Sequence, residues 1–378
     1  MCQACKNSLC SFASEFFANL MTKLKWLLAC GIVLLLAALG LYAYKRLSAD
    51  DAGARAEMLA LLPADATAVI YADLAALRQS PFFLQLYKWA PRPQADADYS
   101  EFLRNTGFDY ERDLNRLAIA VEKRGQESAL FAIAEGHFDR EKITAYASKA
   151  GTLEKRSGRE IFSVPLSGGT RRISFTFLRN DRMAITNDAD LAALLATKQN
   201  NSDAAEWRTR FERLAGSPVF AVVRQGAGAG AALAAQAPGG LRSPQLSALL
   251  DRLQWISLAA KPENDSLRVV ADGESTEEGT ARQLRDLLNG IVFLAQAGLN
   301  DPRTRQQLDP AARDAYLELL KSADVSKIDR GETKSVRLVF DLTPRFLEAA
   351  RLPPPASLEA PVTSQPKPAP SAKPKSRK

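Results

Sequence analysis

Cysteine and histidine are nearly absent from most of this chain. All four cysteines (Cys2, Cys5, Cys10 and Cys30) lie early in the 378 residues, and His137 is the only histidine. Beyond Cys30, a disulfide scaffold, a cysteine-liganded zinc site and a thiolate nucleophile are therefore excluded. With one histidine, a two-histidine metal site is excluded in the whole sequence. Cys2, Cys5 and Cys10 include one Cys-x-x-Cys pair and no second one, so we assign no metal site to them.

Motifs that bind phosphate or carry a nucleophile are also missing. Gly226, Gly228 and Gly230 follow an expected strand, but the later glycine of a dinucleotide fingerprint and the Gly-Lys-Ser/Thr of a P-loop are absent. No Gly-x-Ser-x-Gly elbow occurs in a suitable context. We therefore assign no catalytic, cofactor-binding or metal-binding residue from the sequence, and we expect no cofactor.

Positive charge is concentrated at the C-terminal end. The net charge is +7, and residues 353–378 hold five Lys/Arg and one Glu, which leaves about +3 for the rest of the chain. We therefore expect no specific nucleic-acid partner. Eight prolines in 353–378 predict an extended, disordered tail. The tail is either simply solvated or a contact for an anionic polymer.

One long apolar run stands near the start. Residues 26–44 are nineteen positions without a charge. A helix of this length spans about 28 Å, close to the ~30 Å hydrocarbon core of a bilayer. Trp26 and Tyr44 stand at its ends, and Lys25 and Lys45 flank it, as is typical of the membrane interface. The run predicts a retained, single-pass signal anchor in contact with membrane lipid.

Other interpretations of this run are a cleaved signal peptide and a lipoprotein signal cleaved before Cys30. Only residues 26–29 precede Cys30 without a charge, fewer than the 7–15 residues of a signal core. Three basic residues on each side leave the orientation undecided by charge. We expect the body to be periplasmic and the anchor to lie in the inner membrane, with the reverse orientation left open. Met21 is an alternative start to Met1.

The pattern beyond the run predicts an α+β protein. We divide the chain into a tail (1–25), the membrane helix (26–44), a stalk (45–62), a first module (63–200), a second module (217–345) and the disordered tail (353–378). Strands are expected on both sides of a turn at 124–127. Asp139, Asp188 and Thr276 are expected to cap helices.

The two modules follow one order: strand, helix, hairpin, helix. The sequence ALRQSPFF at 76–83 also echoes GLRSPQLS at 240–247. This repetition predicts a diverged internal duplication, with two related modules of antiparallel sheet covered by helices.

Residues 106–117, TGFDYERDLNRL, are the stretch most suggestive of chemistry. Asp109 and Asp113 would suit acid–base work if one of them were buried and its pKa raised. The same spacing is typical of a charged turn in which Asp113 pairs with Arg116. We favour the structural interpretation and keep a carboxylate-dependent hydrolase or transferase in the first module as the alternative.

Three segments within residues 58–200 carry a family resemblance. LLPADATAVIYADLAALRQSPFF, TGFDYERDLNRLAIAV and AEGHFDREKITAYA resemble, in this order, a group of membrane-anchored bacterial proteins of acidobacterial type. The resemblance implies localisation to the cell envelope and supplies no catalytic residues. Our expectation is a single-pass envelope protein that binds or scaffolds a protein partner and is not an enzyme.

Overall fold

The computed structural model describes residues 52–89, 96–124, 127–166, 171–188, 190–196, 202–225 and 244–350. The expected tail (1–25), membrane helix (26–44) and C-terminal tail (353–378) lie outside these ranges. Within the described ranges, no helix is both long enough and apolar enough to cross a bilayer. The fold is mixed helix and antiparallel sheet, so the α+β class is confirmed.

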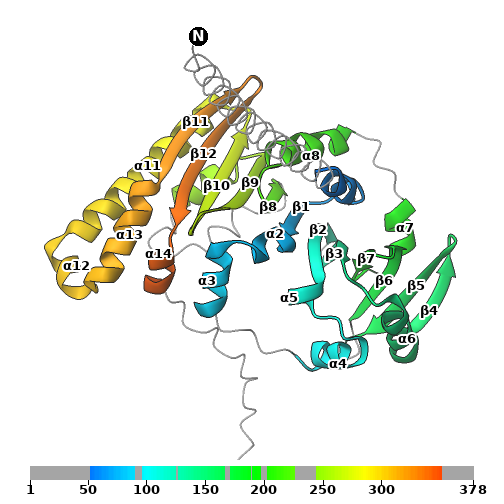
Figure 1. Ribbon diagram of the computed structural model, residues 1–378. Helices are drawn as coiled ribbons and strands as arrows, with labels where there is room; N and C mark the ends of the chain where they lie inside the picture. The colour runs from blue at the N-terminus through cyan, green and yellow to red at the C-terminus, as the bar shows by residue number, and fades with distance from the viewer. Residues whose placement is uncertain are drawn as a thin grey trace, which may run out of the picture.

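The described residues form one twelve-stranded sheet in the order β11-β12-β10-β9-β8-β1-β2-β3-β7-β6-β5-β4 (Figure 1). Every neighbouring pair is antiparallel. The strands are β1 (Ala68–Asp73), β2 (Leu114–Arg124), β3 (Glu127–Gly136), β4 (Thr152–Arg156), β5 (Arg159–Pro165), β6 (Arg172–Arg179), β7 (Arg182–Thr186), β8 (Val219–Arg224), β9 (Trp255–Glu263), β10 (Ser266–Ser275), β11 (Asp324–Arg330) and β12 (Thr333–Leu342).

Two similarly connected halves meet at β1 and β8. Each half starts with one of these strands and continues into a hairpin, β2–β3 or β9–β10. After helices, each half returns with a strand beside its hairpin: β7 beside β3, and β12 beside β10. β1 and β8 pair antiparallel, with Ile70 opposite Ala221 and Tyr71 opposite Phe220. Backbone hydrogen bonds therefore run without interruption from one half of the sheet to the other.

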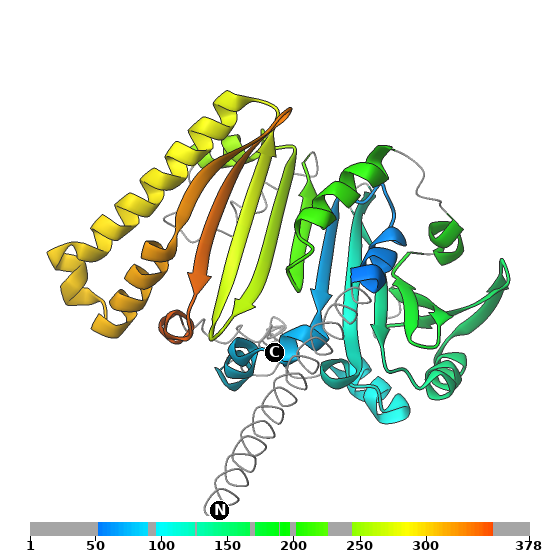
Figure 2. The ribbon, with the colours of Figure 1, turned by 45° about the horizontal axis from the view of Figure 1, so that its top comes forward.

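Helices cover the sheet unevenly. The described helices are α2 (Leu74–Arg78), α3 (Pro81–Trp89), α4 (Ala97–Thr106), α5 (Tyr110–Asp113), α6 (Arg140–Ala150), α7 (Leu191–Ala196), α8 (Ser202–Arg213), α10 (Pro244–Leu250), α11 (Glu278–Asn300), α12 (Pro302–Gln307), α13 (Pro310–Ser322) and α14 (Pro344–Ala349), together with a helical segment at 52–60. Figure 2 shows α11 and α13 at one end of the sheet and α4 and α6 at the other.

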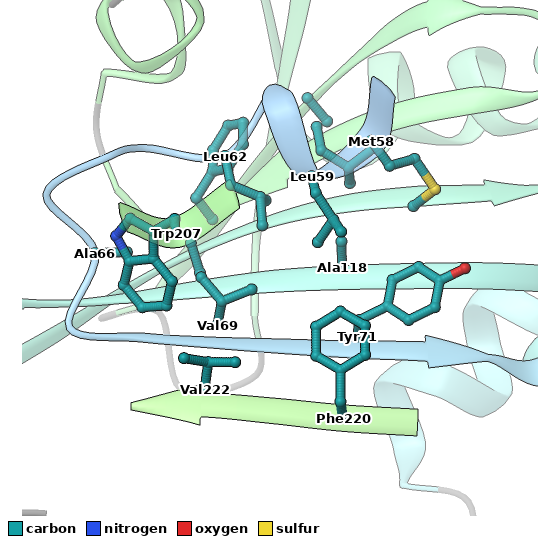
Figure 3. Packing of buried hydrophobic residues seen from close by; sticks show 14 of the residues in the cluster. Met58, Leu59, Leu62, Ala66, Val69, Tyr71, Ala118, Trp207, Phe220 and Val222 are labelled. Atoms are coloured by element: carbon teal, nitrogen blue, oxygen red, sulfur yellow. The ribbon is translucent and has the colours of Figure 1, made fainter. Parts of the chain in front are cut away.

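The main core lies on one face of the central strands, here called the covered face. Val69 and Tyr71 of β1 and Phe220 and Val222 of β8 are at most 1% exposed. Side chains of the helical segment, α7 and α8 pack against them, and Figure 3 shows Met58, Leu59 and Leu62 above Val69 and Tyr71. Each fully buried side chain of this size contributes about 1.5–3 kcal/mol relative to an exposed one.

The helical segment therefore corrects part of the expected stalk, 45–62. Met58 and Leu62 are 0% and 2% exposed, because they complete the core rather than bridge solvent. Glu57 pairs with Arg179 and lies 3.1 Å from Arg182, which is itself 2.9 Å from Glu135 of β3. The folded body thus begins before Pro63.

A buried ionic group fixes α8 to the second half. Glu274 of β10, 1% exposed, accepts hydrogen bonds at 2.7 Å from both Arg210 and Arg213 of α8. The Arg210 guanidinium also lies 3.8 Å from the ring centroid of Trp255. Burial lowers the pKa of Arg210, and the nearby Glu274 carboxylate opposes that shift. Because both arginines bond to the same buried carboxylate, the group ties a helix that follows the first half to a strand of the second.

Several local expectations need correction. The long helix α11 has Glu277 at its N-cap, without a side-chain bond, in place of Thr276. Asp190, and not Asp188, accepts from an α7 amide, that of Ala193, at 2.9 Å. By contrast, Asp139 caps α6 as expected, with a 3.1 Å bond from the Lys142 amide.

We expect Glu274→Gln to lower the free energy of unfolding of the full chain by about 3 kcal/mol, because the buried Arg210 guanidinium would lose its counter-charge. Urea unfolding followed by tryptophan fluorescence measures this, since Trp207 and Trp255 are buried. Glu278→Gln is the matched control, because the Glu278 side chain is 46% exposed. Equal effects of the two variants would contradict the structural role of Glu274.

Candidate functional site

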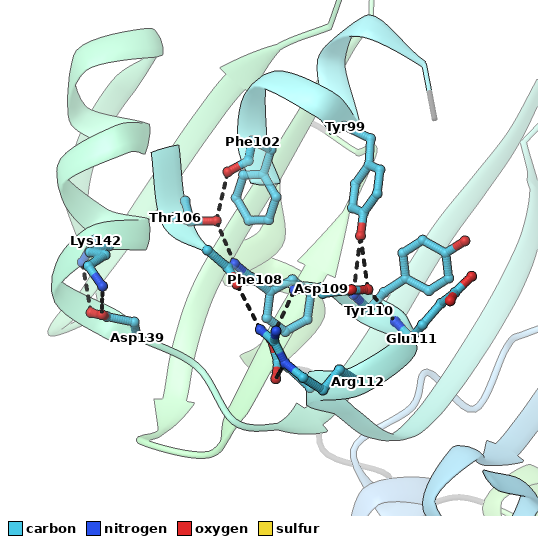
Figure 4. Close-up of polar contacts among 12 residues, drawn as sticks. Tyr99, Phe102, Thr106, Phe108, Asp109, Tyr110, Glu111, Arg112, Asp139 and Lys142 are labelled. Carbon is cyan, nitrogen blue, oxygen red and sulfur yellow. Dashed lines mark hydrogen bonds and ion pairs between the residues drawn. The ribbon is translucent and has the colours of Figure 1, made fainter. Parts of the chain in front are cut away.

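The turn that the sequence singles out is held by its own acids (Figure 4). Asp109 is the N-cap of α5 and accepts from the Glu111 amide at 3.0 Å and from the Tyr99 hydroxyl at 3.4 Å. Asp113 accepts from the Asp109 amide at 2.9 Å. It also forms a two-pronged pair with Arg112, at 2.7 Å to each carboxylate oxygen. Both carboxylates are thus engaged in holding the turn.

The electrostatics of the turn differ from those of a general acid. Hydrogen bonding from Arg112 is the largest effect and lowers the pKa of Asp113, whereas a proton donor at neutral pH needs a raised pKa. Among the described residues, no group of three or more His, Cys, Asp or Glu side chains is arranged to hold a metal ion. The geometry of this turn therefore favours the structural interpretation of Asp109 and Asp113.

The turn packs closely against the sheet at Gly136 of β3. A Cβ atom at Gly136 would lie 2.3 Å from the Asp113 carbonyl oxygen. That carbonyl accepts from the His137 amide at 2.8 Å. His137 itself is exposed and directly follows β3. The backbone around it serves to dock the turn on the strand.

A different surface, on the side of the sheet opposite the covered face, has the features of a binding site. Five central strands, β9, β8, β1, β2 and β3, present apolar side chains there in three cross-strand rows. We call this surface the central apolar face. Its residues are Ile256, Leu258, Ala260, Val219, Ala221, Val223, Ala68, Ile70, Ala72, Leu117, Ile119, Val121, Leu130, Ala132 and Ala134.

This face is only partly shielded. Ile70, Leu130 and Leu258 are 42%, 44% and 46% exposed. Of the fifteen residues, Ala134 alone is buried. Large apolar side chains that remain accessible in a contiguous patch mark a surface that binds something.

Helices enclose the central apolar face at both ends. Ile70 and Ile119 lie in one cross-strand row, which continues through Ala132 of β3 to Ile185 of β7. Ile185 packs with the cluster under α6. At the other end, Ile256 packs with the cluster under α10 and α11. Because side chains two apart on a strand share a face, these clusters lie on the same side as the central apolar face. Packed helix clusters therefore flank the central apolar face at both ends.

Sequence reasoning missed this surface. The strands read AVIYAD, LNRLAIAVEKR and VFAVVR, with apolar residues on both faces. That pattern is typical of strands buried on both sides. The continuous apolar runs were the available signal, but local sequence does not show which face a helix will cover.

The described residues also enclose cavities. One of about 300 Å³ lies between the helical segment and α8 and is lined by apolar side chains that include Leu59, Trp207 and Phe211. Another, of about 740 Å³, lies where β1 ends and β8 begins. Neither is lined by Asp109 or Asp113.

Comparisons with known proteins add little. No protein-family model matches the chain, and no curated protein matches its sequence. Crystal forms III, I and IV of TP0453 match at TM-scores of 0.41, 0.39 and 0.38 and identities of 10%, 10% and 12%. These matches cover 76%, 77% and 77% of this chain and 95%, 95% and 94% of the TP0453 chain. At such scores the likeness supports no functional conclusion, and the acidobacterial-type resemblance stays a prediction.

We expect the contribution of Asp113 to stability to depend on pH. Its folded pKa lies below the unfolded value of about 3.9, so the ionised side chain stabilises the fold above that value. This stabilisation is lost as pH falls through the lowered folded pKa. The difference in unfolding free energy between the native chain and Asp113→Asn should therefore shrink on acidification below about pH 4. A difference that stays constant or grows would contradict this.

Proposed function

We propose that this chain is a single-pass, membrane-anchored envelope protein whose body is a non-enzymatic binding module. Its ligand would be an apolar helix of a partner protein, held on the central apolar face. The observation that carries the proposal is the partial exposure of that face, with Ile70, Leu130 and Leu258 each more than 40% exposed. The anchor would be residues 26–44, with the body in the periplasm.

The shape of the face favours a rod over a flat partner. Five strands at about 4.8 Å spacing make a floor about 19 Å wide between the flanking helices. A helix with its side chains is ~10–12 Å across and fits such a trough. A second flat sheet would meet α6 and α11 before reaching the floor. An anchor would keep the face near the bilayer, where partners with apolar helices are plentiful.

The alternative, a carboxylate-dependent hydrolase or transferase in the first module, receives no specific support. Its proposed acids are engaged in the α5 turn, and the pKa of Asp113 is lowered. We therefore keep one function.

The two halves are proposed to be duplicated modules. Their shared connectivity supports this: an initial strand, a hairpin, then a strand returning beside the hairpin. The extra hairpin β4–β5 would be an elaboration of the first half. Under this proposal the central apolar face spans the junction of the modules.

The binding proposal is tested with one exposed leucine inside the face and one outside it. Leu258 and Leu153 are each 46% exposed, and Leu153 lies on the edge strand β4. With the full chain in nanodiscs, we expect Leu258→Glu to weaken binding of a labelled Leu/Lys amphipathic helix at least tenfold, measured by fluorescence anisotropy against empty nanodiscs. A buried, unpaired charge opposes the apolar contact.

Leu153→Glu should bind the helix as the native chain does. Equal binding by both variants would contradict the proposed site. If Leu258→Glu instead converted a dimer into monomers, the face would be a contact between copies of this chain, and the partner-helix proposal would be wrong.

The anchor is tested by fractionation. We expect the native chain to remain with membranes after alkaline carbonate washing, because a nineteen-residue apolar helix spans the bilayer. The double variant Leu34→Asp, Ala38→Asp should move into the soluble fraction, since each acid costs about 2.5–3.5 kcal/mol at the helix centre. Recovery of a soluble mature chain that begins after Tyr44 would contradict the anchor.

A further inference from the structure

The larger cavity, of about 740 Å³, is a second candidate site, distinct from the central apolar face. It lies at the edge of the sheet where β1 ends, β8 begins and β9 ends. Its wall includes the helical segment, the turn between α2 and α3, and the connection from α8 to β8. Its volume lies within the ~300–1,000 Å³ typical of small-molecule sites.

Positive groups outnumber negative ones in its wall. The charged residues that line it are Arg55, Lys261 and Asp73. Asp73 is already engaged, because one oxygen accepts from the Ala76 amide at 2.8 Å and the other lies 3.6 Å from Arg116. Arg55 donates to the carbonyl of Ala215. Lys261 is exposed and makes no ion pair with the described part of the chain. An anion entering the cavity would therefore meet two cations and one carboxylate that already accepts a hydrogen bond.

A buried hydroxyl points to a missing hydrogen-bond partner. Ser80 lines the cavity and is 7% exposed, and its Oγ has no hydrogen-bond partner within the described residues. A buried polar group left unpaired is destabilising, so its presence calls for an explanation.

Ser80 also stands at the start of a helix. Its carbonyl accepts from the Leu84 amide at 3.1 Å, and α3 runs for nine residues from Pro81. The N-terminal end of a helix carries partial positive charge and unsatisfied amides, which favour an anion. Arg55, Lys261, Ser80 and Pro81, the first residue of α3, thus line one cavity. The two cations and the hydroxyl-bearing helix end suit a ligand rich in acceptor oxygens.

We propose that this cavity binds the phosphate group of a small phosphorylated polyol such as glycerol phosphate. Arg55, Lys261 and the start of α3 would hold the phosphate, and Ser80 would donate to one of its oxygens. The remaining volume and the free lone pairs of Asp73 suit polyol hydroxyls. The same chemistry is presented by a free phosphorylated polyol and by a phosphatidylglycerol headgroup. This site depends on neither the anchor nor the central apolar face.

Isothermal titration of the full chain in a non-ionic detergent tests the site. We expect glycerol phosphate to bind at one site, inorganic phosphate to bind more weakly, and glycerol to show no binding. Dihexanoyl phosphatidylglycerol, a soluble short-chain lipid, separates the two sources. If dihexanoyl phosphatidylglycerol binds more tightly than glycerol phosphate, the ligand is a lipid headgroup. If it binds more weakly, the ligand is a free phosphorylated polyol. Absence of binding by every phosphate-bearing probe would overturn the proposal.

Two variants and a control locate the site. Lys261→Gln and Ser80→Ala should each raise the dissociation constant for glycerol phosphate about tenfold, through loss of one charge-assisted contact. Ser80→Ala should leave the melting temperature of the unliganded chain unchanged or higher, because the hydroxyl has no partner, which separates a binding defect from misfolding. Lys149→Gln, an exposed lysine on α6, should bind normally. Native affinity in both site variants, or an equal loss in Lys149→Gln, would overturn the assignment.

Discussion

The structure depends on the antiparallel pairing of β1 with β8. The Asp73 amide donates to the Pro218 carbonyl at 2.7 Å, and the Arg224 amide donates to the Thr67 carbonyl at 2.8 Å, at the two ends of this pair. Between them, stacked Tyr71 and Phe220 rings lie 5.1 Å apart. Without this pairing each half would expose a strand edge and half of an apolar core. With it, α8 and the helical segment at 52–60 close one shared core across both halves.

The joined sheet has two different faces. On the covered face, side chains of the helical segment, α7 and α8 bury Val69 and Tyr71 almost completely. On the opposite face, the helices of the described ranges that bury apolar clusters lie toward the two ends, and the junction itself has an apolar floor between them. An exposed apolar floor is unfavourable in water. A bound helix that removes it from water would turn this cost into binding free energy, as the proposed function requires.

Much of the local structure followed from the sequence, and the long-range structure did not. The hairpin of β2 and β3, in which Arg124 lies opposite Glu127, and the Asp139 cap are local choices of turn and cap residues, and both are present. The edge strands β4 and β11 were missed, because TLEKR and DVSKIDR carry the charges that protect edges and hide the strand pattern. The Glu274–Arg210 pair joins residues 64 positions apart, and the central apolar face depends on which helices pack where. No local sequence pattern indicates either this ion pair or the central apolar face.

Native-state hydrogen exchange of the full chain tests the central claim, that the halves are one cooperative unit joined at β1 and β8. If the halves are one unit, the hydrogen-bonded amides of these two strands exchange as slowly as those of β2 and β9, through global unfolding. Fast exchange in β1 and β8, with β3 and β10 still protected, would mean that the halves separate while each stays folded. In that case the shared core and the continuous apolar floor described above would both be wrong.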